Sequence, residues 1–529
     1  MLIPLIIAFP LFAILGMTRS KVAPKSLHGF FGILLTLVPM VYVFINGSVA
    51  TLTIPSVYTL YWYFHSYSFV GAVSFVVVGS ILTLFITQFL NRSQLIAFAI
   101  ALSSALGITL SQNYFGLFVF WELLTISTSL IIFFEKDTDL SIGRNFLLTH
   151  LAGGLALLFG IMLQFHATQS LALVPPSSGQ IFFLIGIGMK VGFVPLHFWI
   201  PATYSTIHPA STVALSIFTT KAGIVVLMKL FSGYEPLIYM GLLMIFFGIY
   251  SSLCKQNFRE ILSYQHVSQL GFMVVAIGTG GALGVNGGFM HMTNHMIYKS
   301  LLFMITALIF IYSGSESLKT QHKKPLWLLG FALLGSLAIM GLPPLNGFAS
   351  KTLIKYASSD VIQILLSISA VGTALSFARF FYYGFWHTSP CQRVSDRFAQ
   401  VGTEVKLAMG LLSGLILLIG VAPGILSSIT PYRYESMYSL AGAIQALGAI
   451  AVGGLLFVVL RTNLQPVLVR QVSNGTFSNT LLVLANNLVD SVVRWEKHIT
   501  QLNNAQFILP VLTLLFLLLM VTSALQGKF

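Results

Sequence analysis

The stretch IFFLIGIGMKVGFVPLHFWIP, residues 181–201, is long and apolar enough to span a bilayer, yet it carries Lys190 near its centre. A charged side chain at the bilayer centre costs roughly 2.5–3.5 kcal/mol on insertion scales. The same stretch contains Gly192 and Pro195, and proline removes a backbone donor and disrupts the turn before it. A charge on an interrupted membrane helix indicates a protein interior or a water-filled path rather than lipid.

The chain as a whole has the composition of a polytopic membrane protein. Its 529 residues are 56% hydrophobic and 8% charged, with a mean hydropathy of +0.90, whereas soluble proteins carry about 25% charged residues. We expect an all-α fold of about 16 transmembrane helices. The predicted spans lie near 2–17, 27–47, 67–90, 94–111, 113–134, 143–166, 179–200, 206–228, 236–253, 261–280, 287–312, 326–355, 361–386, 405–428, 438–460 and 506–524.

The net charge of +14 is distributed along the chain as in a membrane protein, not as in a nucleic-acid-binding protein. Most lysines and arginines fall in loops after odd-numbered spans, whereas loops after even-numbered spans and the tail hold only Lys229, Lys355, Arg433 and Lys528. This is the positive-inside pattern. We therefore expect a multi-pass protein of the cell inner (cytoplasmic) membrane, with both termini on the outer, periplasmic side and no nucleic-acid partner.

Two interrupted spans predict an inverted repeat. The span 326–355 contains Gly341, Pro343 and Pro344 ahead of Lys351 and occupies the same place in the second five-helix block as 179–200 does in the first. An odd number of helices makes the two blocks enter from opposite sides, as in transporters built around broken helices. The expected units are helices 1–3 (1–93), a first repeat (94–232), a second repeat (233–388), helices 14 and 15 (389–460), a lateral segment (461–503) and a last helix (504–529).

The lateral segment is predicted to form a short amphipathic helix on the cytoplasmic membrane surface. Apolar residues recur there at mostly helical spacing from Leu481 to Trp495, with polar residues between them. The alternative is a loop with one short helical turn.

Glu122 is the one acid that falls in the middle of a predicted span, YFGLFVFWELLTISTSLIIFF, residues 114–134. A lone buried carboxylate would become neutral, whereas a carboxylate opposite a lysine can stay charged, and each partner then tunes the protonation of the other. We interpret Glu122 as the modulator of Lys190. The alternative is a structural ion pair that fixes helix packing.

Further titratable residues occupy later spans. Lys221 has about ten apolar residues on either side, so its ammonium cannot reach an interface. His291, His295 and Lys299 are spaced four residues apart and line one side of a helix. A pair of histidines at this spacing can bind zinc, but no further ligand is nearby in sequence, so we expect a proton relay and no metal.

Four other histidines have two competing interpretations each. His150 and His266 could extend the relay or serve as hydrogen-bonded structural histidines. His197 and His208 flank the junction of the seventh and eighth spans, where a role in proton access competes with a role at a helix end.

No cofactor is expected in this chain. Its two cysteines, Cys254 and Cys391, are too few for an iron–sulfur cluster, and the sequence has no nucleotide-binding fingerprint. A redox enzyme in its own right is the competing class. It stays open whether the chain is a subunit of an enzyme such as NADH-quinone oxidoreductase or a membrane-bound hydrogenase.

The segments FWELLTIS, KVGFVPLHFWIPATYSTIHPASTVALSIFTTKAG, REILSYQHVSQLGF, HMTNHMIYKSLLF and GLPPLNGFASK follow one another between about Phe120 and Lys351. As a set they resemble the antiporter-like membrane subunits of respiratory complex I, Mrp-type cation/proton antiporters and membrane-bound hydrogenases. The loop IPATYSTIHPAS departs from the family pattern because it lacks the usual acid.

The resemblance implies two inverted proton half-channels joined by a central row of charged residues. It implies a modulating role for Glu122 with Lys190 as its partner, a terminal role for Lys351, and bridging, central and relay roles for Lys221, Lys299, His291 and His295. We therefore expect a proton-translocating subunit of a multisubunit complex, with Na⁺ exchange left open. Expected partners are other membrane subunits, a soluble or peripheral coupling subunit and lipid. A redox module, an antiporter assembly or an inorganic-carbon-capturing partner could each supply the coupling.

Overall fold

The computed structural model describes residues 2–19, 25–45, 50–54, 58–62, 66–136, 138–318, 321–388, 392–427 and 438–461. Within these residues the protein is helical apart from one antiparallel hairpin, β1 (Ala50–Ile54) with β2 (Tyr58–Trp62), which the sequence analysis did not include. The predicted span 506–524 and the lateral segment beyond its first residue lie outside the described residues.

The helices confirm a multi-pass membrane protein. In the part of the chain that the structure describes, thirteen helices are long and apolar enough to cross a membrane, and Ile6–Thr18 and Leu326–Met340 are shorter apolar helices. Every predicted span that falls on described residues overlaps one helix or a run of two or three consecutive helical segments. The first third of the chain forms α1 (Leu2–Arg19), α2 (Lys25–Leu34), α3 (Leu37–Ile45), α4 (Ser66–Ile86), α5 (Arg92–Leu110), α6 (Tyr114–Phe133) and α7 (Leu140–Thr168).

Both spans with proline and glycine in their middles are broken. The first consists of α8 (Gln180–Val191), the 3₁₀ turn η1 (Leu196–Phe198) and α9 (Trp199–Tyr204), and the second of α15 (Leu326–Met340) and α16 (Asn346–Ala357). Gly192 and Gly341 end α8 and α15 with φ of 86° and 87°, a left-handed conformation that favours glycine. The predicted inverted relation of the two blocks stays a prediction.

The eighth predicted span is also broken, although no proline or glycine lies at the break. It consists of α10 (Pro209–Leu215) and α11 (Thr219–Phe231), separated by a turn at residues 216–218. The carbonyl of Ser216, left free by this turn, accepts a hydrogen bond of 2.6 Å from Nζ of Lys221. A buried lysine therefore satisfies the backbone of the break, as membrane interiors require.

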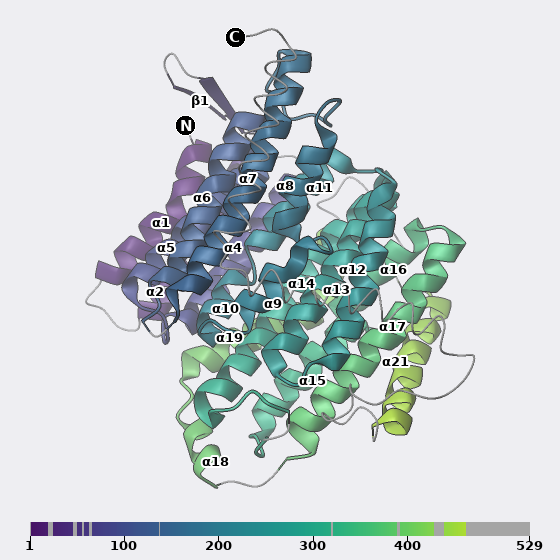
Figure 1. Cartoon of the computed structure of the whole chain (residues 1–529). Helices are drawn as coiled ribbons and strands as arrows, with labels where there is room; N and C mark the ends of the chain where they lie inside the picture. The colour runs from purple at the N-terminus through teal and green to yellow at the C-terminus, as the bar shows by residue number, and fades with distance from the viewer. Residues whose placement is uncertain are drawn as a thin grey trace.

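The later helices surround α13 and α14, which run through the middle of the bundle (Figure 1). Small residues let neighbours approach closely, since a Cβ added at Gly241 of α12 would lie 2.6 Å from the carbonyl oxygen of Gly271 on α13. The π-turn η2 (Tyr382–Trp386) directly follows α17. The remaining bounds are α12 (Pro236–Cys254), α13 (Phe258–Thr279), α14 (Gly281–Ser313), α17 (Asp360–Phe381), α18 (Gln392–Ala399), α19 (Thr403–Val421), α20 (Gly424–Ser427) and α21 (Leu440–Leu460).

One end of the bundle is tied together by a buried ion pair. Arg259, at the start of α13, donates from Nε to both carboxylate oxygens of Glu316 at 2.8 Å and from Nη1 to the carbonyl of Ile207. Ile207, Arg259 and Glu316 lie in or beside the connections that follow the seventh, ninth and eleventh predicted spans. The charge pattern predicts that all three are cytoplasmic.

Candidate functional site

Lys190 is held by the helix that carries Glu122. It lies in the last turn of α8 with 1% of its surface exposed. Its Nζ donates to Oγ1 of Thr125 at 2.9 Å and to the carbonyl of Trp121 at 3.2 Å, both on α6, and lies 4.5 Å from the Trp121 ring centroid. The ammonium is thus hydrogen-bonded although it is enclosed by protein.

Glu122 is adjacent to Lys190 but does not form an ion pair within 4 Å with it in this conformation. The two charges interact electrostatically. Both carboxylate oxygens are buried without a hydrogen-bond partner among the described residues. The carboxylate lies against Gly154 of α7, where a Cβ would collide with Oε1. A buried carboxylate with no fixed partner can change its partner or its charge at low cost.

The next group joins α11 to α13. Nζ of Lys221 lies 3.2 Å from Nε2 of His266, and the hydroxyl of Thr220 lies 3.1 Å from the same nitrogen. Lys221 and His266 are fully buried. His266, which the sequence analysis left between two interpretations, therefore directly contacts a buried lysine.

From His266 a row of imidazoles continues onto α14. The ring centroids of His266 and His295 are 4.7 Å apart, and those of His295 and His291 are 6.4 Å apart. Lys299, one turn after His295, donates to the carbonyl of Leu262 at 2.6 Å. Nothing in the described residues forms a cluster of three or more His, Cys, Asp or Glu able to hold a metal.

The row reaches the second broken helix. Nδ1 of His291 lies 3.0 Å from Oγ of Ser350, the residue before Lys351. Nζ of Lys351 donates to the carbonyl of Ile339 at 2.6 Å and lies 4.9 Å from the Phe272 ring centroid. Lys351 thus satisfies a carbonyl near the end of α15, much as Lys221 does at the break between α10 and α11.

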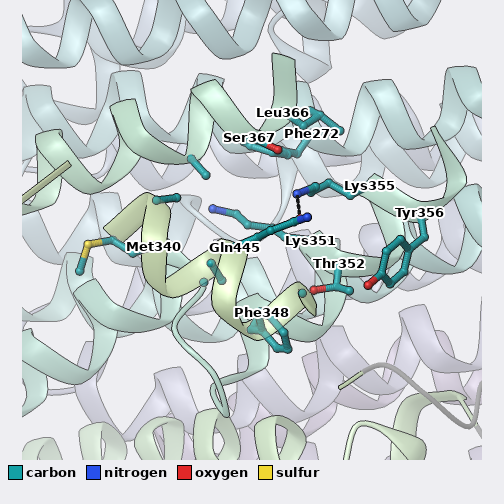
Figure 2. A pocket seen from close by; sticks show the side chains of 15 residues that line it. Phe272, Met340, Phe348, Lys351, Thr352, Lys355, Tyr356, Leu366, Ser367 and Gln445 are labelled. Atoms are coloured by element: carbon teal, nitrogen blue, oxygen red, sulfur yellow. Dashed lines mark hydrogen bonds between the residues drawn. The ribbon is translucent and has the colours of Figure 1, made fainter. Parts of the chain in front are cut away.

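Lys351 borders a cavity of about 60 Å³ between α13, α16, α17 and α21 (Figure 2). The cavity has room for a few water molecules. Lys355, one turn after Lys351, also lines it and donates to Oε1 of Gln445 on α21 at 2.7 Å, as the dashed line in Figure 2 marks. From its place at the end of a predicted span Lys355 is expected among loop residues, whereas its side chain lines this cavity.

His150 is buried at 1% exposure, and neither ring nitrogen has a hydrogen-bond partner among the described residues. Its ring centroid lies 4.4 Å from those of Phe146 and of Trp199, and it interacts electrostatically with Lys190. The geometry therefore does not give His150 the hydrogen bonds of a structural histidine.

The other two histidines lie apart from the row. His197 in η1 is fully buried and packs edge-on against Phe247, with ring centroids 4.6 Å apart. His208 caps α10, because its Nδ1 accepts from the N–H of Ala210 at 3.3 Å. For His208 the structure supports the helix-end interpretation.

An acid does reach the loop that lacks one in the sequence. Glu135, which follows α6, accepts hydrogen bonds from the backbone N–H of His208 and, at 2.8 Å, from Oγ of Ser211. The contact joins residues more than seventy positions apart in the chain, and local sequence carries no signal for it.

Comparison with known proteins supports the assignment of the fold. The family described as "NADH:quinone oxidoreductase/Mrp antiporter, TM" matches residues 111–376, half of the chain. The Na⁺/H⁺ antiporter subunit A1 of Staphylococcus aureus is 24% identical over 472 residues, covering 76% of this chain. This chain spans only 59% of the length of that relative.

Two solved structures share the fold along nearly the whole chain. A chain of the Mrp complex from Dietzia sp. DQ12-45-1b superposes with a TM-score of 0.75 at 20% identity, covering 98% of this chain and 63% of the other. A chain of the membrane-bound sulfane sulfur reductase, an archaeal respiratory membrane complex, gives a TM-score of 0.74 at 20% identity, covering 98% and 99%.

Proposed function

Because this chain belongs to the NADH:quinone oxidoreductase/Mrp antiporter family of transmembrane proteins, we propose that it is a proton-translocating subunit of a multisubunit membrane complex. The observation that carries the proposal is the row of buried titratable side chains that crosses the bundle. It consists of Glu122, Lys190, Lys221, His266, His295, His291, Lys299 and Lys351.

The position of this row supports transport over a structural role. Charged groups inside a membrane are costly and usually mark ion paths. Three of the lysines, Lys221, Lys299 and Lys351, donate to backbone carbonyls rather than to carboxylates. A carbonyl can hold an ammonium but does not fix its charge permanently, so each lysine can release and regain a proton.

The mechanism begins at Glu122 and Lys190. A conformational or electrostatic signal moves the carboxylate toward or away from the ammonium and so changes the proton affinity of Lys190. The altered charge then acts on Lys221, and the proton passes through His266, His295 and His291, because an imidazole can accept a proton at one ring nitrogen and donate one from the other. Lys299 biases this passage electrostatically, and Lys351 delivers the proton to the cavity beside α16.

The names of related proteins support a proposal about the partners that drive proton translocation. One relative is named a Na⁺/H⁺ antiporter subunit and one structural neighbour belongs to a respiratory complex. We therefore propose other membrane subunits and a peripheral coupling subunit as partners, with Na⁺ as the exchanged ion. The proposed location is the inner membrane.

A Lys190→Met variant tests the proposal, because methionine keeps the apolar stem and removes the titratable amine. In vesicles containing the assembled complex, we expect the proton flux reported by a pH-sensitive dye to fall at least tenfold. The control is Lys229→Met, which removes a lysine that binds the carbonyls of Thr109 and Ser111 outside the row. Unchanged flux in an assembled Lys190→Met complex would refute the proposal.

A further inference from the structure

A cavity lined by both polar and apolar side chains opens between α7 and the second half of the first broken span. It measures about 360 Å³ and is lined from α7 by Ser141, Asn145 and Thr149 and from the opposite side by Thr203 and Thr206. A cavity of this size holds many water molecules. We call it the vestibule.

One side of the vestibule carries polar side chains that can bind water. Ser141, Asn145 and Thr149 are four residues apart and therefore share one side of α7. Oδ1 of Asn145 is shielded from bulk solvent and has no hydrogen-bond partner among the described residues. Leaving an amide oxygen dry and unpaired is costly, so a turn of the amide toward the vestibule, where water could reach it, would be favourable.

The inner wall of the vestibule is aromatic. Phe146 and Trp199 line it, with ring centroids 5.5 Å apart. Directly behind them lies His150, 4.4 Å from each ring centroid and 1% exposed. Two rings thus separate the vestibule from an imidazole with no hydrogen-bond partner among the described residues, and that imidazole interacts electrostatically with Lys190.

The Trp199 ring is held in place by the helix that carries Lys190. Its Nε1 donates to the carbonyl of Met189 at 2.8 Å, one residue before Lys190. Met189 also packs against α7, since a Cβ added at Gly153 would lie 2.9 Å from Cβ of Met189. A shift of the end of α8 would therefore move Lys190 and release the indole together.

We propose that the vestibule is the water-filled uptake route to Lys190, closed by a gate of Phe146 and Trp199, with His150 as the proton acceptor behind it. This inference rests on the proposed function. When the gate opens, a hydronium ion gives its proton to one ring nitrogen of His150 and leaves as water. The imidazolium then gives a proton to the neutral amine of Lys190, and both nitrogen groups return to their starting charge after Lys190 passes its proton on.

Cysteine labelling tests the vestibule without relying on transport. In the full complex with Cys254 and Cys391 replaced by serine, Asn145→Cys is compared with Leu148→Cys. Leu148 lies seven residues before Leu155, an exposed residue of α7, and so shares its side of the helix. A membrane-impermeant maleimide should label position 145 at least tenfold faster, because thiolates form only in contact with water.

Equal, slow labelling at positions 145 and 148 would mean that lipid fills the groove, and the vestibule would be overturned. This outcome differs from a failure of the proposed function, which the Lys190→Met flux alone decides. The gate is tested by Trp199→Phe, which keeps a ring and removes the indole N–H. We expect at least threefold faster labelling of His150→Cys, which lies behind the rings, and, with His150 intact, a raised uncoupled proton leak. No change in either would exclude the gate.

The acceptor is tested by His150→Gln. We expect at least a tenfold loss of coupled proton flux, with normal amounts of assembled complex and unchanged labelling at position 145. A packing role for His150 would instead reduce the amount of assembled complex and leave the flux per complex intact. That result would remove His150 from the route.

Discussion

At the scale of single residues, Gly154 determines where the carboxylate of Glu122 can lie. Any Cβ there would collide with Oε1, so a larger residue would force the carboxylate to move. The glycines of the segment LLTHLAGG are therefore explained by close packing: Gly153 admits Met189 of α8, and Gly154 admits Glu122 of α6. Two consecutive glycines of α7 thus lie against the two helices that carry the members of the proposed modulating pair.

Gly154→Ala should displace the carboxylate without removing it. We expect the proton flux to fall at least fivefold, together with a loss of stability of about 1–3 kcal/mol from overpacking. The matched control is Gly410→Ala in α19, where an added Cβ meets nothing within 4 Å. Flux equal to wild type in both variants would show that the position of Glu122 is not required.

Lys324, in the loop before α15, gives a prediction about pH. Burial lowers the pKa of this lysine from 10.5 to about 7, although it donates to Oε1 of Gln321 and the carbonyl of Gly384, each at 2.7 Å. Between pH 7 and about 10.5 the unfolded chain therefore binds more protons here than the folded chain, so stability should rise with pH. Lys324→Met should flatten this rise, measured as thermal unfolding midpoints of the detergent-solubilised complex between pH 7 and 9. A slope identical to wild type would contradict it.

At the scale of elements, breaks in the helices lie next to three of the buried lysines, Lys190, Lys221 and Lys351. Proline and glycine in 181–201 and 326–355 were enough to predict two of these breaks from sequence. The break between α10 and α11 was not predictable, because its turn is Ser216, Ile217 and Phe218 and carries no breaker. A side-chain hydrogen bond from Lys221 to the carbonyl of Ser216 spans that turn, and neither proline nor glycine marks it in the sequence.

The break after α8 depends on Gly192, and Gly192→Ala tests it. The residue has φ of 86°, and a Cβ would lie 2.5 Å from Cδ1 of Ile200. Left-handed backbone costs a residue with a Cβ about 1–2 kcal/mol, and the contact adds to that cost. Gly233→Ala, at φ of 81° with nothing within 4 Å, isolates the backbone part. We expect a lower thermal inactivation midpoint for Gly192→Ala than for Gly233→Ala, and equal midpoints would show that the contact relaxes freely.

At the scale of the whole molecule, the long-range contacts explain what sequence reasoning could and could not find. Glu122, Lys190, Lys221 and Lys351 stand out in sequence because each is a charge in an apolar stretch. The place of His266 between Lys221 and His295 depends on how α11, α13 and α14 pack, and the contact of Glu135 with α10 depends on loop geometry. Single-chain patterns carry neither kind of information.

The distribution of charge over the whole molecule predicts its orientation in the membrane. Hairpin β1–β2 and the N-terminal end of α1 lie at one end of the bundle and α18 at the other (Figure 1). Lys136 is exposed in the loop after α6, predicted to be cytoplasmic, and Ser170 is exposed in the loop after α7, predicted to be outside. In the cysteine-free full complex, an impermeant maleimide should label Lys136→Cys only in inverted vesicles and Ser170→Cys only in right-side-out vesicles. The opposite pattern would reverse the orientation. The lining of the vestibule includes Ser141, only five residues after Lys136 in the chain. With the reversed orientation the vestibule would therefore draw its protons from outside the cell.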